Sequence, residues 1–273
     1  MTSHAHLPQP TSRAHSPKTF HVVVVSGGAE PDARVAQQLG VVDFVIAADS
    51  GLSHAEQLGL PVTTAIGDFD SVVTGVLAEA EARGVEIVPY PVNKDATDLE
   101  LALELAVQRG ATHVTVISGG PGERLDHFLG EVSVLTASFL SGCRVTGWFG
   151  SAKVSVVRPE FPFRISGEPG DLVTLLPVTT ETKGVSTTGL QYALNNEILH
   201  AWRTRGVSNV LLNEFGEVSI TDGVMLCIQP DGLAATLHGT TPQGMPLHGT
   251  PLHGTTLHGT TKHGTTTHGT TTP

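Results

Sequence analysis

The feature that most constrains the fold is a repeated alternation of short apolar runs and helix-like segments between residues 19 and 150. The first run, Val22–Val25, is four consecutive valines, which is typical of a buried parallel strand. Glycine, serine or aspartate follows most of these runs, and glycine closes most of the helix-like segments. Repeats of this length predict an α/β fold with an open, mainly parallel sheet and helices on both faces.

The individual elements follow from the same pattern. Strands are expected at 22–25, 41–48, 64–66, 86–88, 113–118 and 144–149, and helices at 32–39, up to 58, and at 73–83, 98–109 and 126–138. The clearest of these helices is 98–109. Thr97 and Glu100 form a capping box before it, and Gly110 is a C-terminal stop signal.

Residues 151–230 differ in character from the first half. Short β-rich runs occur at 152–157, 171–176, 207–213, 218–221 and 225–229, separated by Gly, Pro and Thr. No long amphipathic helix is visible among them. This half is therefore expected to form an all-β, sandwich-like domain, with the boundary near Gly150.

The two ends have compositions that do not favour a packed core. Residues 1–18 are rich in Pro, Ser and His, and residues 231–273 repeat the triplet His-Gly-Thr. Both are expected to be disordered, because they have few apolar residues to bury. The histidines of the tail could bind metal weakly, but a tail without function is the favoured interpretation. The folded part is then 19–230, with an α/β domain at 19–150 and a β domain at 151–230.

The charge balance excludes several classes of protein. The chain has 15 Lys and Arg against 26 Asp and Glu, a net charge of −11. Binders of nucleic acid or of anionic membranes normally have a basic surface, so neither partner is expected. Cys143 and Cys227 form no CxxC pair, and no apolar run is long enough for a signal peptide or a membrane span. A cytoplasmic location is expected.

Aspartates gather in the loops that should follow the parallel strands. In an open parallel sheet, ligands bind beyond the carboxyl ends of the strands. Six of the chain's 11 aspartates fall there: Asp49, Asp68, Asp70, Asp95, Asp98 and Asp126. One or two could be helix caps, but six carboxylates at one edge repel one another unless a cation is present. Oxygen-only ligand sets suit Mg²⁺, so a metal site is expected at this edge.

The same edge carries glycines and isolated cations. The run from Ser118 to Gly122 could bring backbone N–H groups close to a ligand, beside the start of a helix. Lys94 and Arg124 could contact phosphates, or could only form salt bridges with the aspartates. His127 could be a general base or a packing residue. Together these features indicate a metal–polyphosphate site, and the absence of GxxxxGK[ST] excludes a P-loop enzyme.

Four ordered motifs in the first half resemble the thiamine pyrophosphokinase (thiamine diphosphokinase) family. They are Asp49-Ser50-Gly51, the run from Ile66 to Ser71 (IGDFDS), the run from Lys94 to Asp98 (KDATD) and the run from Gly119 to His127 (GGPGERLDH). Two stretches of the second half, from Thr187 to Tyr192 and from Gly206 to Asn209, are similar to motifs of the family's β domain. The resemblance covers about residues 20–230.

The resemblance implies transfer of pyrophosphate from ATP to thiamine, giving AMP and thiamine diphosphate in a homodimer. It implies that Mg²⁺ is held by Asp68, Asp70 and Asp98, and that Arg124 and Asp126 complete the catalytic group. It places nucleotide and substrate contacts at Asp49, Ser50, Lys94, Asp95, Gly119, Gly120 and His127, and the thiamine pocket at Tyr192, Ser208 and Asn209. Glu123 stands where the family usually has Gly, and Glu131 where Asn is common.

Two other functions remain open on the residues alone. A phosphohydrolase with Asp68 as its nucleophile would share the Asp-x-Asp pattern, although no later set of lysine and acid is evident. A non-catalytic nucleotide-sensing module would bind ATP and Mg²⁺ without forming AMP. An assay of AMP release with and without thiamine separates the three.

Overall fold

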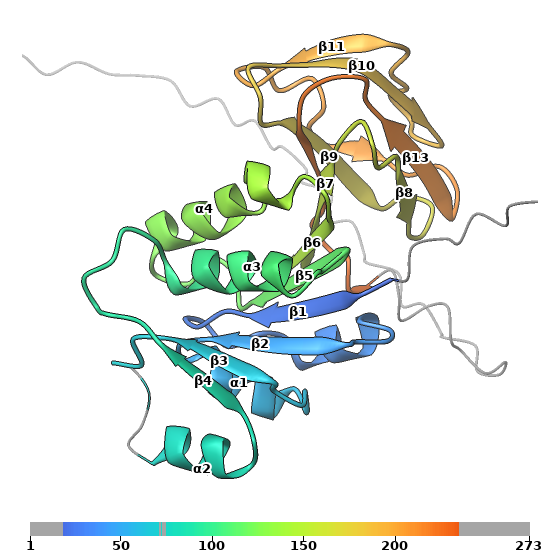
Figure 1. The fold of residues 1–273 in the computed structure, drawn as a ribbon. Helices are drawn as coiled ribbons and strands as arrows, with labels where there is room; N and C mark the ends of the chain where they lie inside the picture. Colours follow the sequence, from blue (N-terminus) through green and yellow to red (C-terminus); the bar gives the residue numbers. More distant parts are fainter. Residues whose placement is uncertain (1–18, 71, 73–74, 235–273) are drawn as a thin grey trace, which may run out of the picture. The chain divides into compact units, whose positions relative to one another are not determined.

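The computed structural model describes residues 19–70, 72 and 75–234, and its main element is a large mixed sheet (Figure 1). Six strands in the order β6-β5-β1-β2-β3-β4 form its parallel part. They are β1 (His21–Val25), β2 (Phe44–Ala48), β3 (Thr64–Gly67), β4 (Glu86–Pro89), β5 (His113–Ser118) and β6 (Arg144–Phe149). The predicted open parallel sheet is confirmed.

Helices cover both faces of the parallel strands. The helical elements are η1 (Ala33–Gln38), α1 (Gly51–Gln57), α2 (Val76–Ala82), α3 (Asp98–Gln108), α4 (Leu125–Val134) and η2 (Ser138–Leu140). Val22 and Val24 pack in one cluster with Leu103 of α3, whereas Val23 packs on the other face with Ala55 of α1. Because alternate residues of a strand point to opposite faces, a strand of valines serves both clusters.

Helix ends follow local hydrogen bonds. The Thr97 hydroxyl accepts a bond from the Glu100 N–H at 3.2 Å, as the capping box predicts. The helix expected at 126–138 ends at Val134, and a separate 3₁₀ turn follows. Arg158 donates to the carbonyls of Thr136 and Ala137, at 2.9 and 3.0 Å, so these groups do not continue the helix. The segment expected as helix 32–39 is the 3₁₀ helix η1.

The second half extends the large sheet and adds a smaller one. Antiparallel strands β7 (Ala152–Val157), β14 (Met225–Gln229), β9 (Leu172–Pro177) and β12 (Asn209–Val210) continue the large sheet beyond β6. The smaller sheet is antiparallel, in the order β11 (Glu197–His200), β10 (Glu181–Thr188), β13 (Phe215–Ser219) and β8 (Phe163–Ser166). Val173 and Met225 of the large sheet pack with Ile165 and Val185 of the small one. A C-terminal antiparallel β domain is thereby confirmed, while the large sheet itself passes Gly150 without interruption.

The packed chain extends past residue 230. Leu233 is 1% exposed, packs in the cluster that contains Trp148, and its N–H donates to the Ser151 carbonyl at 3.3 Å. Residues 1–18 and 235–273, for which disorder was predicted, lie outside the described residues. Within the described part of the chain, no helix is both long and apolar enough to cross a bilayer.

Candidate active site

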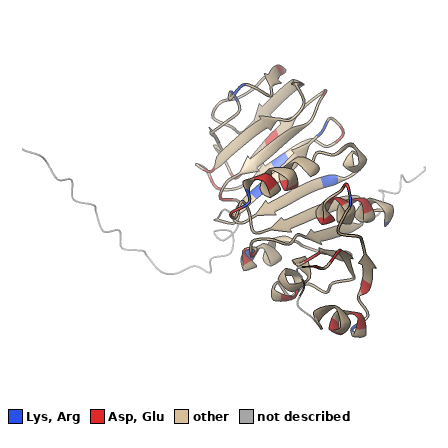
Figure 2. Cartoon of the chain, turned by 90° about the vertical axis from the view of Figure 1, so that its left-hand side faces the viewer, with Lys and Arg blue, Asp and Glu red and all other residues tan. Residues whose placement is uncertain are grey.

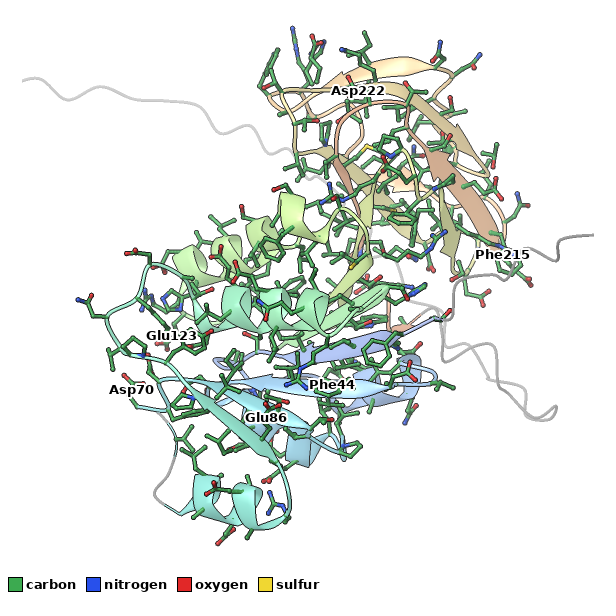
Figure 3. All side chains as sticks on the ribbon, in the orientation of Figure 1. Phe44, Asp70, Glu86, Glu123, Phe215 and Asp222 are labelled. Carbon is green, nitrogen blue, oxygen red and sulfur yellow. The ribbon has the colours of Figure 1, made fainter. Side chains whose placement is uncertain are left out.

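Three aspartates converge at the carboxyl edge of the parallel strands. Asp49 follows β2, and Asp68 and Asp70 follow β3. One carboxylate oxygen from each lies within 4.8 Å of the other two. Asp49 and Asp68 are half-buried, whereas Asp70 is exposed on a loop at this end of the sheet (Figure 3). A group of oxygen ligands with one open side can hold a divalent cation that a substrate also contacts.

The backbone around this cluster is shaped to bring three loops together. Asp49 has a left-handed φ of 49°, and its N–H donates to the Ile66 carbonyl at 2.9 Å. Gly67 has a φ of 151°, and a Cβ there would lie 3.2 Å from Asp98 Oδ1 and 3.3 Å from the Asp49 Cα. Only glycine therefore allows the ends of β2 and β3 and the start of α3 to approach this closely.

Lys94 links the cluster to Asp98. Its ammonium donates to Asp68 Oδ2 at 2.5 Å and contacts Asp98 Oδ1 at 3.2 Å. The hydrogen bond from Lys94 lowers the pKa of Asp68, which is therefore ionised at neutral pH. Burial opposes the charge of Lys94, but its bonds to Asp68 and then Asp98 outweigh burial and raise its pKa. Burial raises the pKa of Asp98.

The structure brings all four of these aspartates to one place. Asp68 and Asp70, two of the three predicted metal ligands, are grouped with Asp49, for which a substrate contact is expected. Asp98 lies beside this group and is paired with Lys94. Asp98 is the first residue of α3, and Lys94 lies in the loop before this helix, where the two side chains meet.

Glu131 connects the ends of β1 and β5. In the sequence it was noted only as a departure from the family pattern. Ser26 directly follows β1, and Ser118 is the last residue of β5. The strand order of the sheet reverses between these two adjacent strands. The hydroxyls of Ser26 and Ser118 donate to Glu131 Oε1 and Oε2, at 2.7 and 2.8 Å. Both serines are buried, at 5% and 2% exposed. The signal for this contact in the sequence is a serine at or directly after the end of each of two buried strands.

The glycine-rich loop after β5 lies against the loop after β1. The backbone of Gly119 is in close contact with the carbonyls of Ala29 and Glu30, and Gly120 lies beside the end of β6. The Ser50 side chain lies against Gly27 in the same way. The structure therefore packs these predicted phosphate-binding segments around the ends of β1, β2 and β5.

The predicted residues at the start of α4 face solvent. Arg124 donates to both oxygens of Asp126, at 2.9 and 2.6 Å, and the two side chains are 64% and 66% exposed. The hydrogen bond from Arg124 holds the pKa of Asp126 well below its usual range. His127 and Asp95 are exposed as well. Among the described residues, the carboxylate paired with Arg124 is that of Asp126 and none of the aspartate cluster.

The predicted substrate residues of the second half lie on two neighbouring segments, one after β10 and one at the start of β12. Asn209 is 3% exposed, and its side chain accepts from the Tyr192 N–H and donates to the Tyr192 carbonyl, both at 2.9 Å. The Tyr192 side chain is 60% exposed. Ser208 has a left-handed φ of 58°, and its N–H donates to Thr174 Oγ1 at 3.1 Å. Asn209 thus fixes the backbone of Tyr192 and leaves its ring open to a ligand or partner.

The fold and the site define a class of protein. An open α/β sheet with a carboxylate cluster, a lysine and glycine loops at its carboxyl edge is typical of metal-dependent enzymes that act on polyphosphates. Acidic segments surround this edge in Figure 2, which looks onto it. The family model "Thiamin pyrophosphokinase, catalytic domain" matches residues 35–146, and "Thiamin pyrophosphokinase, vitamin B1 binding domain" matches residues 163–225. The chain belongs to the thiamine pyrophosphokinase family.

Individual relatives agree with this assignment. A thiamine pyrophosphokinase of Bacillus subtilis is 26% identical over 210 residues, which are 76% of this chain and 96% of the relative. The crystal structure of the Bacillus subtilis protein has a TM-score of 0.66 at 24% identity, covering 77% of this chain and 98% of the other. The thiamin pyrophosphokinase of Candida albicans has a TM-score of 0.61 at 14% identity, covering 82% and 97%. These structures share the fold described above.

Proposed function

We propose that this chain transfers pyrophosphate from ATP to the hydroxyl of thiamine, giving thiamine diphosphate and AMP. Family membership supports the reaction, because models of both the catalytic and the vitamin B1 binding domain match the chain. The observation that carries the proposal is the cluster of Asp49, Asp68 and Asp70 beside Lys94, at the edge where such folds bind ligands.

We assign Mg²⁺ to the three clustered aspartates. Their oxygens are hard ligands, Asp68 is ionised by its contact with Lys94, and Asp70 leaves one side exposed, so the residues present fit this ion. When bound, Mg²⁺ supplies charge neutralisation on the polyphosphate. Asp98 keeps Lys94 in place and completes the charge balance on the buried side of the cluster.

The remaining residues position the two substrates. Lys94 lies at the cluster and contributes positive charge next to the transferred phosphates. Backbone groups of Gly119 and Gly120, with Ser50, form the nucleotide side of the site. When substrate binds, the Arg124 side chain releases Asp126 and pairs with the phosphates. Both side chains are exposed, so they are free to make this change. His127 and Asp95 complete the substrate contacts. Positioning of this kind supplies most of the rate in phosphoryl-type transfer.

Tyr192 is the proposed platform for thiamine. Its ring is 60% exposed while its backbone is fixed by Asn209, an arrangement that suits stacking on a flat cationic ligand. Ser208 lies in the adjoining turn. Leu125 and Leu129, one turn apart on α4, are 62% and 57% exposed and offer an apolar surface to a second copy of the chain. We therefore propose a homodimer, which sedimentation of the active protein tests.

Release of AMP from ATP and Mg²⁺, measured with and without thiamine, tests the proposed function. The expected result is AMP formation that requires thiamine and equals the thiamine diphosphate formed. Phosphate release without thiamine would instead indicate a phosphohydrolase, and nucleotide binding without turnover would indicate a sensing module. Either result would contradict the proposal.

A further inference from the structure

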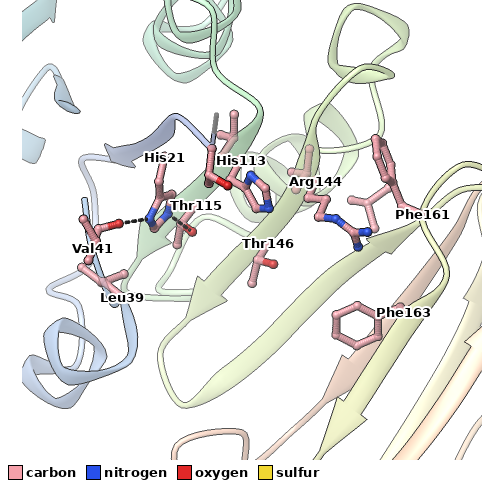
Figure 4. Close-up of a pocket in the computed structure, with 13 residues that line it drawn as sticks. His21, Leu39, Val41, His113, Thr115, Arg144, Thr146, Phe161 and Phe163 are labelled. Atoms are coloured by element: carbon pink, nitrogen blue, oxygen red, sulfur yellow. Dashed lines mark hydrogen bonds between the residues drawn. The ribbon is translucent and has the colours of Figure 1, made fainter. Parts of the chain in front are cut away.

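A cavity lies at the edge of the parallel sheet opposite the aspartate cluster, where β1, β5 and β6 begin (Figure 4). Its volume is about 440 Å³, within the range of small-molecule sites. The strands run from this edge toward the aspartate cluster, and a five-residue strand spans roughly 17 Å. The cavity is therefore separate from the candidate active site and is lined by residues that the proposed reaction does not use.

The polar groups that line the cavity are basic and hydroxylic. Arg144, His113 and His21 line it together with Thr115 and Thr146, and no Asp or Glu is among its lining residues. This is unexpected in a chain with a net charge of −11. The terminal segments outside the described residues contain no Asp or Glu either, so neither can supply an acidic side chain to the cavity.

The side chains of Arg144 and His21 are held in place without an acidic partner. The Arg144 guanidinium lies 5.0 Å from the centroid of the Phe161 ring, and among the described residues no carboxylate is within ion-pair distance of it. His21 is fixed by contacts of its two ring nitrogens with the Val41 carbonyl at 2.9 Å and Thr115 Oγ1 at 2.8 Å. Figure 4 shows His113 between His21 and Arg144. An anion entering here would meet preformed cationic and hydroxyl groups.

The rest of the lining is apolar and includes two aromatic rings. Phe161 and Phe163 lie near Arg144, and Leu39 and Val41 lie beside His21 on the other side (Figure 4). Apolar and aromatic walls of this kind favour a ligand with a flat apolar ring next to its charged group. Thiamine itself fits this cavity poorly, because its thiazolium ring is a cation and would face Arg144 without a carboxylate.

We propose that this cavity binds a small aromatic molecule that carries one anionic group, either a carboxylate or a phosphate. The anion pairs with Arg144 and accepts hydrogen bonds from the hydroxyls that line the cavity floor. The ring lies against Phe161 and Phe163. Burial, with the charges of Arg144 and His21, lowers the pKa of His113, so this ring is neutral at pH 7 and the guanidinium carries the charge.

Calorimetric titration of the full chain with phenyl phosphate, phenylacetate and benzylamine tests the proposal. We expect at least one anionic probe to bind with a Kd on the order of 1 mM, as fits so few atoms, and benzylamine not to bind. The anionic probe that binds more tightly shows whether the cavity prefers a phosphate or a carboxylate. Saturating ATP and Mg²⁺ should leave the binding unchanged, because the cavity lies at the other edge of the sheet.

Substitutions locate the bound probe. Arg144→Gln should weaken the anionic probe about tenfold or more, because a charged hydrogen bond is lost. Thr146→Val should weaken it less. Arg83→Gln is the matched control, since Arg83 is an exposed arginine paired with Glu56 at the end of α2. Equal binding of benzylamine, displacement by ATP, unchanged binding in Arg144→Gln at an unchanged melting temperature, or no binding of either anion would overturn the proposal.

Discussion

At the residue scale, Asp70 is the most informative residue of the cluster to change, and it is also the exposed one. Asp70→Asn should lower turnover by about a hundredfold or more, because one charged ligand of the proposed metal is lost. The melting temperature should change little, since Asp70 is exposed and contributes nothing to the apolar core. Turnover at several Mg²⁺ concentrations and a thermal melt measure both effects.

The control for this variant is Asp222→Asn. Asp222 is an exposed aspartate paired with Lys183 in the β domain, outside the cluster. It should keep full activity. If Asp70→Asn also kept full activity at limiting Mg²⁺, Asp70 would not be a metal ligand.

Glu131 provides a second prediction at this scale. Glu131→Ala leaves the buried hydroxyls of Ser26 and Ser118 without their acceptor, which should cost about 2 kcal/mol and lower the melting temperature by roughly 4–8 °C. Glu131→Gln retains one acceptor oxygen and should lose less. Melting curves of the two variants decide the point, and equal, unchanged melting temperatures would show that the bridge contributes nothing to stability.

The sequence could predict that aspartates gather at one edge of the sheet, but not how closely each pair of carboxylates approaches. Carboxylates that follow neighbouring parallel strands must meet at one edge, which the strand pattern alone establishes. The distances of Asp49 and Asp98 from Asp68 depend on the direction of each side chain. That direction is influenced by the left-handed backbone of Asp49 and by the salt bridge between Lys94 and Asp98. Neither property can be read from residue spacing.

At the element scale, the docking of α1 on β1 depends on one glycine. A Cβ at Gly51 would overlap the carbonyl of Val25, so Gly51→Ala must push the start of α1 away from the end of β1. The expected loss of stability is about 3 kcal/mol. Activity should fall as well, because Asp49 and Ser50 directly precede this helix.

Gly130→Ala is the matched substitution within α4. A Cβ at Gly130 would meet nothing within 4 Å, and the residue is helical. This variant should gain about 0.5–1 kcal/mol, since alanine is the better helix former. Chemical denaturation of both variants gives the comparison, and a stable Gly51→Ala protein would refute the close contact with Val25.

Helices and strands with a strong local sequence pattern could be predicted. Strands that depend on pairing with residues distant in the sequence could not. The valine run of β1 and the capping box of α3 were predicted correctly from local chemistry. Strands β8, β10 and β11 were not predicted. The sequence of β10, ETKGVSTT, has one apolar residue and an internal glycine, so it shows no alternating apolar pattern. Its pairing with β11 and β13 makes it a strand. Such pairing is a tertiary effect that overrides local propensity.

At the scale of the whole molecule, one sheet passes through both halves of the chain. Strands β7, β14 and β9 continue the parallel sheet in antiparallel fashion, so residues on both sides of Gly150 share a hydrogen-bonded layer. The composition shift near residue 150 indicated a change of architecture, but strand content alone does not show which sheet a strand joins. The family's catalytic and vitamin B1 binding models still match on opposite sides of this position.

The end of the packed chain gives a prediction at this scale. A chain that stops after Ala234 should retain full activity and stability, whereas one that stops after Pro230 loses the buried Leu233. Burial of one leucine contributes about 2 kcal/mol, which corresponds to roughly 4–8 °C in melting temperature. Thermal melts and turnover of the two truncated chains test it. A large loss of turnover in the chain ending at Ala234 would mean that the remaining tail takes part in the reaction.

The central claim is that both outer phosphates of ATP move to thiamine as one unit, and the fate of an isotope tests it most directly. ATP labelled with ¹⁸O at the non-bridging oxygens of its β-phosphate, incubated with thiamine, Mg²⁺ and the full chain, should give unlabelled AMP. The thiamine diphosphate formed should carry the label on the phosphate that is bonded to thiamine. The same mixture with the Asp70→Asn chain should give neither product at a comparable rate. Formation of ADP, or label released as free phosphate in the absence of thiamine diphosphate, would contradict the account.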